Sequence, residues 1–281
     1  MLKQRIITAI VLLAVLLPAV FYPAPEAFGV VALVLIVAGA WEWAKLNQYA
    51  PSVALAAGFL CALSCVGSWY VGLVYAPPKV LWVLTGSVWV FLGAWLLYGG
   101  AAVWVKVPKA LRLIGGLLAL WVAWLAVVQA RIMGINFLFS VLVLVWAADI
   151  FAYFAGRTLG GRFFARKLAP SISPGKTWEG VCGGLVGVTG VAFVWRALDG
   201  VGGATHASLY TLLGKNGLVF MALALLFLTM MSVVGDLLES LFKRSAGVKD
   251  SSNLLPGHGG VLDRVDALLP ILPLAMIFAT L

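Results

Sequence analysis

The sequence predicts an all-α, polytopic integral membrane protein with about nine transmembrane helices. The mean hydropathy is +1.08, and 63% of the 281 residues are hydrophobic whereas only 10% are charged. Soluble proteins carry about 25% charged residues, and a helix needs about 20 mainly apolar residues to cross a bilayer. Apolar runs of about that length follow one another along the whole chain. We therefore expect a bundle of membrane-spanning helices.

The expected spans, in chain order, are 6–22, 28–46, 52–74, 79–98, 111–132, 135–156, 178–197, 217–240 and 265–281. Most prolines fall between these runs, where a missing backbone N–H donor is tolerated. Pro270 and Pro273 lie inside the last run and are expected to kink it. The first run follows Lys3 and Arg5, as a signal peptide would. However, no small-residue cleavage site precedes Pro23, so we interpret the run as a helix.

Basic residues divide unequally between the two sides that nine spans define. Fifteen of the nineteen lysines and arginines fall on the side of the N-terminus, and the other four fall on the opposite side. Cytoplasmic loops carry the excess of basic residues in membrane proteins. The N-terminus is therefore expected in the cytoplasm, and the C-terminus on the opposite side of the membrane.

Charged residues are densest in the stretch that begins at Asp236, DLLESLFKRSAGVKDSSNLLPGHGGVLDRVD. Asp236 and Glu239 share a face near the end of an apolar helix, and Asp263 and Asp266 repeat this spacing. Carboxylates around a glycine-rich turn can bind a hard cation such as Mg²⁺, with substrate phosphate oxygens completing its shell. Four basic side chains can neutralise the remaining phosphate charge: Lys243, Arg244, Lys249 and Arg264. His258 lacks partners for zinc, so we expect it to donate to phosphate or to make a structural contact.

Two further polar features lie upstream. Asp149 interrupts an apolar run, so it lies either at a span end misplaced by one turn or in a polar cavity lined by several helices. The basic loop that follows offers Ser173, Lys176 and Thr177 to phosphate groups, although an ordinary positive-inside loop has a similar composition. Its glycines lack the spacing and the preceding strand of a P-loop, so that motif is excluded.

Small residues in the seventh run indicate close helix packing. Gly180 with Gly184, and Gly183 with Gly187, are pairs four residues apart that let another helix approach closely. Packing within the chain is the first interpretation, and the interface of a homodimer is the second. The three cysteines lie in apolar runs with no other potential metal ligands near them in the sequence, and no disulfide is expected.

The polar positions together carry a resemblance to a known family. The stretch contains Ser240-Leu-Phe-Lys243-Arg244, Lys249-Asp250, Pro256-Gly-His258-Gly-Gly and Asp263-Arg264-Val-Asp266, and this pattern resembles the motif of phosphatidate cytidylyltransferases. Asp149 with 152–157, and the segment 173–180, resemble the family as well. The N-terminal half resembles it in hydropathy and in Glu42. The chain is therefore divided into N-terminal transmembrane helices, about five spans over 1–134, and a C-terminal catalytic region, 135–281, with cytoplasmic loops 157–177 and 241–264.

The resemblance implies transfer of a cytidylyl group from CTP to phosphatidic acid, giving CDP-diacylglycerol and pyrophosphate for phospholipid biosynthesis in the cell inner membrane. It implies Mg²⁺ as cofactor, leaves open a second, monovalent cation, and gives no reason to expect a nucleic-acid partner. The implied metal ligands are Asp236, Asp263 and Asp266, with Glu239 and Asp149 as further candidates. The implied catalytic residues are Lys243, Asp263, Asp236 and Arg264. The implied contacts to substrate phosphates are Ser173, Lys176, Thr177, Ser240, Arg244, Lys249 and His258.

Three other functions share some of these features. A CTP-dependent lipid or polyprenol kinase would use the same cation and phosphate chemistry but would release CDP instead of pyrophosphate. A cation-coupled transporter would also hold carboxylates in the membrane, but the sequence has no inverted internal repeat and its charges gather at one face. A purely structural membrane protein would not require the carboxylates and lysines to gather in one stretch.

Overall fold

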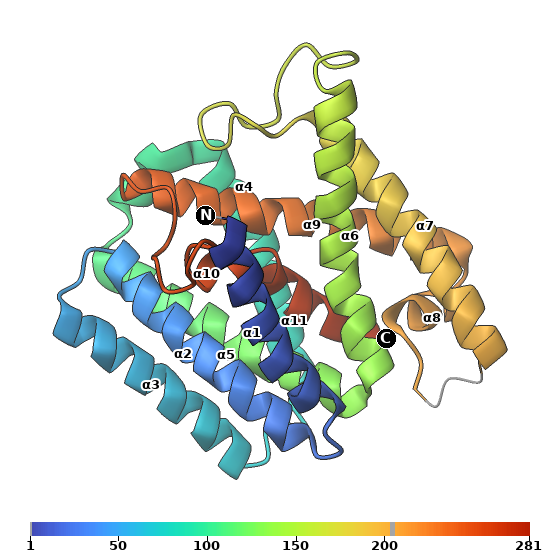
Figure 1. Ribbon diagram of the computed structural model, residues 1–281, viewed down its shortest axis with the longest axis horizontal. Coiled ribbons are helices and arrows are strands. Elements are labelled where there is room, and N and C mark those ends of the chain that lie inside the picture. Colours follow the sequence, from blue (N-terminus) through green and yellow to red (C-terminus); the bar gives the residue numbers. More distant parts are fainter. Residues whose placement is uncertain (1, 203–205) are drawn as a thin grey trace.

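The computed structural model describes residues 2–202 and 206–281, and these residues are predominantly helical (Figure 1). The helices are α1 (Leu2–Phe21), α2 (Pro25–Leu46), α3 (Pro51–Tyr70), α4 (Lys79–Lys106), α5 (Lys109–Met133), α6 (Ile135–Leu159), α7 (Trp178–Gly202), α8 (Leu209–Lys215), α9 (Leu218–Ser245), α10 (Leu262–Val265) and α11 (Leu268–Ala279). Eight of them, α1 to α7 and α9, are long and apolar enough to cross a membrane. The predicted class, an all-α polytopic membrane protein, is confirmed.

The C-terminal segment differs from the ninth span expected over 265–281. It forms the four-residue helix α10 and the twelve-residue helix α11. Twelve helical residues extend about 18 Å, whereas the hydrocarbon core of a bilayer is about 30 Å thick. Helix α11 instead packs inside the bundle against α4, α5 and α9. Its high apolarity thus reflects burial among other helices. Pro270 lies in its first turn, where no backbone donor is needed, and Pro273 lies in its interior.

Prolines and glycines set most helix boundaries, as the sequence predicted. Pro25 and Pro51 are the first residues of α2 and α3, a position where the missing N–H has no helical partner anyway. Gly134, with φ of +136°, separates α5 from α6. Two expected loops are shorter than predicted, because α6 continues to Leu159 and α9 to Ser245. The connecting segments are therefore 160–177 and 246–261.

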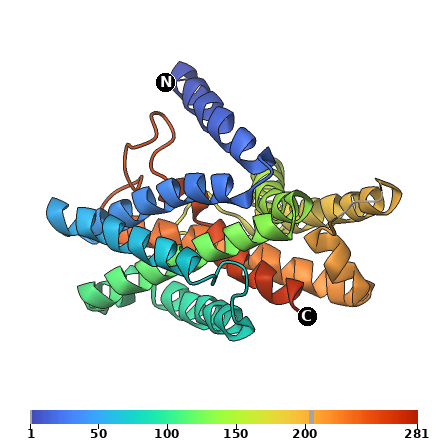
Figure 2. The ribbon, with the colours of Figure 1, turned by 90° about the horizontal axis from the view of Figure 1, so that it is seen from below.

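The long helices alternate in direction, and their contacts define two ends of the bundle. Near one end, called the charged end, the Trp43 ring of α2 packs 5.2 Å from the Phe242 ring of α9. At the opposite end, Lys79 Nζ of α4 donates to the Thr280 carbonyl oxygen, 2.8 Å away. The first residues of α1 and the segment 246–261 meet at the charged end. Seen from below, α1 and α4 lie on opposite sides of the bundle (Figure 2).

Helices α6 and α7 lie side by side (Figure 1) and pack through the glycines of α7. A Cβ atom on Gly180 would lie 3.0 Å from the carbonyl oxygen of Ala152, and one on Gly184 would lie 2.9 Å from that of Ala148. Gly183 and Gly187 meet α6 in the same way. The interpretation of these glycines as packing residues is confirmed, and their partner is α6 of the same chain.

A second close helix contact sets the position of the charged residues. A Cβ atom on Gly235 of α9 would lie 2.7 Å from the carbonyl oxygen of Asp266 and 3.0 Å from the Cα atom of Ala267. Only glycine lets the backbones approach so closely. This contact places Asp236, the next residue of α9, beside the segment that joins α10 to α11.

Substituting Gly235→Ala should therefore destabilise the protein. The added methyl group would separate α9 from the Asp266–Ala267 backbone, and overpacking of this kind costs about 1–3 kcal/mol. Gly190→Ala on α7 is the matched control, since a Cβ atom there would meet nothing within 4 Å. Thermal unfolding in detergent should show a lower Tm for Gly235→Ala alone. Equal Tm values for the two variants would contradict the close contact.

Candidate active site

Five acidic side chains, called the carboxylate cluster, gather toward the charged end. They are Asp149 on α6, Asp236 and Glu239 on α9, Asp263 on α10 and Asp266 directly after it. Two lysines accompany them, Lys176 just before α7 and Lys243 on α9. The folded chain thus brings together residues up to 117 positions apart in sequence. All five were predicted from the sequence as metal-ligand candidates.

Lys243 is the central cation of the cluster. Its ammonium group pairs with Glu239, one turn earlier on α9, and with Asp263 Oδ1 at 2.6 Å. The side chains of Lys243 and Asp263 are only 14% and 5% exposed. A charge pair that is shielded from water in this way interacts more strongly than a surface pair. Lys243 therefore ties the end of α9 to α10.

The carboxylate of Asp263 also organises the turn before α10. Its Oδ2 atom accepts hydrogen bonds from Ser251 N at 2.9 Å, Ser251 Oγ at 3.0 Å and Gly260 N at 2.8 Å. Burial favours the neutral acid, but the interactions with Glu239 and Lys243 and the two backbone N–H donors outweigh it and lower the pKa of Asp263 to about 2. Asp263 is therefore ionised at neutral pH.

The second part of the cluster surrounds Asp236. Lys176 forms an ion pair with it, and Ser240 Oγ lies 3.4 Å from its Oδ1 atom. Asp149 is close enough to Asp236 and Lys176 to interact electrostatically with both. Burial, followed by the negative charges of Asp236 and Asp149, raises the pKa of Asp266 to about 7. Asp149 lies ten residues before the end of α6 and is exposed, so it does not lie at the end of that helix.

A buried carboxylate that the sequence hardly indicated supports the same turn. Glu42 on α2 is 0% exposed. Its oxygens accept hydrogen bonds from Val261 N at 2.9 Å and Leu262 N at 2.8 Å, at the start of α10. They also accept from the hydroxyl groups of Ser251 at 3.2 Å and Ser252 at 2.5 Å. Glu42 therefore anchors the turn and accepts hydrogen bonds from N–H groups at the start of α10 that have no partner within the helix. No local pattern marks this role, because its partners are more than 200 residues away.

The first turns of α1 contact the other side of this turn, which the sequence did not predict. Arg5 Nε donates to the carbonyl oxygen of Gly257 at 2.9 Å, and Thr8 Oγ1 donates to that of Pro256 at 2.9 Å. Gly257 has φ of +76°, and a Cβ atom there would lie 2.9 Å from Arg5 Cγ. Both the backbone conformation and the close approach therefore require glycine.

Most of the remaining predicted site residues form no hydrogen bond or ion pair with the cluster in the part of the chain that the structure describes. Arg264 donates from Nη2 to the carbonyl oxygen of His258 at 2.7 Å, which closes the turn on itself. Thr177 Oγ1 accepts from Gly180 N at 3.1 Å and so caps α7. Arg244 and Lys249 are exposed on the surface of the charged end. Within 2–202 and 206–281, no three His, Cys, Asp or Glu side chains converge as a ready-made metal site.

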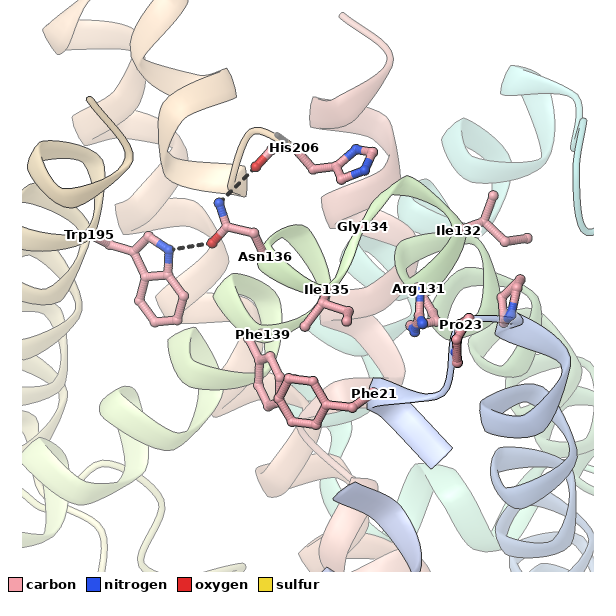
Figure 3. A pocket seen from close by; sticks show the side chains of 11 residues that line it. Phe21, Pro23, Arg131, Ile132, Gly134, Ile135, Asn136, Phe139, Trp195 and His206 are labelled. Atoms are coloured by element: carbon pink, nitrogen blue, oxygen red, sulfur yellow. Dashed lines mark hydrogen bonds between the residues drawn. The ribbon is translucent and has the colours of Figure 1, made fainter. Parts of the chain in front are cut away.

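A cavity of about 700 Å³, lined among others by Phe21, Arg131 and Trp195 (Figure 3), lies where α1 and α5 end. Its buried Arg131 donates to the carbonyl oxygens of Val20 and Tyr22, at 2.7 Å each, and so caps α1. Asn136 donates to Asp199 and accepts from Trp195. These polar groups hold helix ends together, so their contacts are structural.

Comparisons with known proteins agree with the motif. The model of the "Cytidylyltransferase family" matches residues 3–281. A phosphatidate cytidylyltransferase of Pseudomonas aeruginosa is 38% identical over 291 residues, which cover 100% of this chain and 97% of the relative. One of Haemophilus influenzae is 37% identical over 292 residues, with coverage of 97% and 96%. One of Brucella abortus is 46% identical over 147 residues, 52% of this chain. The similarity thus includes the N-terminal half, which had matched only in hydropathy and Glu42.

Replacing Glu42 by Gln should destabilise the charged end. The amide keeps one acceptor oxygen but turns an NH₂ group toward N–H donors, and losing a hydrogen bond to a charged group costs about 1.5–3 kcal/mol. At about 2–4 °C per kcal/mol, the value for proteins of 150–250 residues, a loss of this size lowers Tm by roughly 3–12 °C. Glu26→Gln is the matched control, because Glu26 accepts an exposed hydrogen bond from Tyr75 at the opposite end. A Tm for Glu42→Gln that equals the control would show that the buried carboxylate is dispensable.

Proposed function

The chain belongs to the cytidylyltransferase family, and from this premise we propose that it transfers the cytidylyl group of CTP to phosphatidic acid. The products are CDP-diacylglycerol and pyrophosphate, and the reaction takes place at the cytoplasmic face of the inner membrane. Three observations support the proposal: the family match over 3–281, the similarity over nearly the whole chain to two phosphatidate cytidylyltransferases, and the motif from Ser240 to Asp266. The observation that carries it is the cluster in which Lys176 and Lys243 pair with Asp236 and Asp263.

The proposed chemistry fits what these side chains can do. The phosphate group of phosphatidic acid is already an oxyanion, so its attack on the α-phosphorus of CTP needs no serine and histidine to create a nucleophile. The main barriers are bringing two polyanions together and stabilising the charge that develops on the leaving pyrophosphate. Lys176 and Lys243 can exchange their carboxylate partners for phosphate oxygens. The exposed Arg244 and Lys249 add positive charge at the same end.

Mg²⁺ is the cofactor that this donor set fits. Carboxylate oxygens are the protein ligands that Mg²⁺ prefers, and the cluster offers them from α6, α9, α10 and the residue that follows α10. We propose Asp236 and Asp266 as ligands, with Asp149 and Glu239 beside them. Asp263 would join them when its Oδ1 atom releases Lys243. When bound, the metal would offset phosphate charge and polarise the phosphoryl oxygens.

The location of the cluster suits the two substrates. Phosphatidic acid keeps its acyl chains in the bilayer, whereas CTP arrives from water, so the site must lie near a membrane surface. The cluster lies toward one end of the long helices, the end that carries fifteen of the nineteen basic residues. The positive-inside rule assigns such an end to the cytoplasm.

The proposal is tested by following both products. Purified protein in detergent micelles is incubated with phosphatidic acid and CTP labelled at the α-phosphorus, with and without Mg²⁺. We expect the label in a lipid product, with equimolar pyrophosphate, only when Mg²⁺ is present. Release of CDP with an unlabelled lipid would instead identify a CTP-dependent lipid kinase.

Replacing Asp236 by Asn should reduce kcat at least about a hundredfold, the size typical of losing one electrostatic contact in an active site. The substitution removes a proposed metal ligand and the partner of Lys176 while it preserves side-chain size. Glu26→Gln at the opposite end should keep wild-type turnover. Near-normal Mg²⁺-dependent turnover in Asp236→Asn would contradict the assigned role.

Replacing Lys243 by Met should raise the KM for CTP or for phosphatidic acid. Met keeps the length of the side chain but has no charge to offer a phosphate, and it leaves Asp263 without its closest cation. Size-exclusion chromatography of the purified variant establishes that it is folded. An unchanged kcat/KM for both substrates would count against the phosphate contact.

A further inference from the structure

The segment between α6 and α7 exposes aromatic and basic side chains together. Phe163 is 73% exposed and Phe164 is 45% exposed, although both lie outside the apolar helices. Arg162 and Arg166 flank them and are exposed as well. We call residues 160–167 the aromatic-basic loop. It extends beyond the end of α6 and away from the bundle (Figure 1).

A buried carboxylate holds the loop in this conformation. Glu179, in the first turn of α7, is 4% exposed. Its Oε1 atom accepts hydrogen bonds from the backbone N–H groups of Gly161 at 2.9 Å, Phe163 at 3.1 Å and Phe164 at 3.1 Å. The two Phe side chains are thus presented outward by a fixed backbone. Their exposure is a property of the folded loop.

We propose that the aromatic-basic loop is a docking surface for the headgroup layer of a membrane that contains anionic phospholipids. Aromatic side chains gather at the boundary between acyl chains and headgroups, and Phe163 and Phe164 would enter that boundary. Arg162 and Arg166 would meet lipid phosphates, because clustered basic residues attract anionic membrane surfaces. The exposed charges of this segment are all positive, because no acidic residue lies between Asp149 and Glu179 and the Glu179 side chain is buried. A soluble phosphate would leave the two exposed rings without a partner.

The loop also bears on the candidate active site, and this part of the inference rests on the proposed function. The same segment continues to Lys176, which pairs with Asp236 in the carboxylate cluster. A loop seated on an anionic surface would concentrate an anionic lipid substrate beside Lys176. Its effect on turnover should therefore appear in the dependence on the lipid and not in the dependence on CTP.

A spin-label experiment tests the docking itself, without any activity measurement. The variant Phe163→Cys, in a Cys182→Ser background, is labelled with a nitroxide and reconstituted in zwitterionic vesicles and in vesicles with added anionic phosphatidylglycerol. We expect the label to be accessible to oxygen and protected from a water-soluble nickel complex, and more so in the anionic vesicles. The label at Asp250→Cys, on the exposed segment after α9, is the aqueous control. A label at residue 163 as water-accessible as the control, in both kinds of vesicle, would overturn the proposal.

The contribution to substrate capture is tested with Arg162→Gln/Arg166→Gln. Each basic residue near an anionic surface contributes about a fivefold effect. The KM for phosphatidic acid, expressed as its mole fraction in the membrane, should therefore rise at least about fivefold, with kcat and the KM for CTP unchanged. Lys106→Gln/Lys109→Gln is the matched control, because it removes two charges at the same end but outside the aromatic-basic loop, and its KM for the lipid should rise less than that of the loop variant. An unchanged KM for the lipid in an active enzyme would reject the capture role.

A wild-type protein without any cytidylyl transfer would reject the proposed function. The spin-label experiment would still decide whether the loop docks on the membrane.

Discussion

The buried ion pair between Lys243 and Asp263 is the interaction on which the charged end of the structure depends. It joins α9, the longest apolar helix of the C-terminal half, to α10 and the glycine-rich turn before it. Removing one partner of such a pair leaves an uncompensated buried charge, which is far less favourable than the intact pair. The remaining lone pairs of Asp263 are satisfied by N–H and hydroxyl donors of the turn, at 2.8–3.0 Å. The pair therefore fixes where the glycine-rich turn lies relative to the membrane helices.

Two contacts from the N-terminal half complete the support of this turn. Glu42 accepts the N–H groups that begin α10, and the first turns of α1 bind the carbonyl oxygens of Pro256 and Gly257. The turn is thus held from three directions by helices that are distant in sequence. This arrangement gives the N-terminal helices a role in the site, although none of the sequence-predicted site residues belongs to them.

The sequence predicted the elements that depend on local or periodic features. Apolar runs, most of them separated by prolines, identified all eight long helices, and carboxylates three residues apart identified the acidic residues of α9 and α10. The sequence could not separate a membrane span from a buried core helix at the C-terminus, because α11 is as apolar as a span and differs only in length. It also could not reveal the roles of Glu42, Arg5 and Thr8. Their partners lie 209 to 252 positions away, and the positions themselves show no pattern.

The same lysines that stabilise the cluster are those best placed to leave it. A group of carboxylates near one end of a membrane bundle would repel one another without cations, and Lys176 and Lys243 offset that repulsion. Lysine suits an exchange of partners, because its charge sits on a flexible chain and its three donors have no fixed plane. When Mg²⁺ and two polyanionic substrates enter, as we propose, the metal would take over the carboxylates and the lysines would become free to bind phosphate. On this proposal, the ion pairs of the protein keep the carboxylates and lysines close together before the substrates bind.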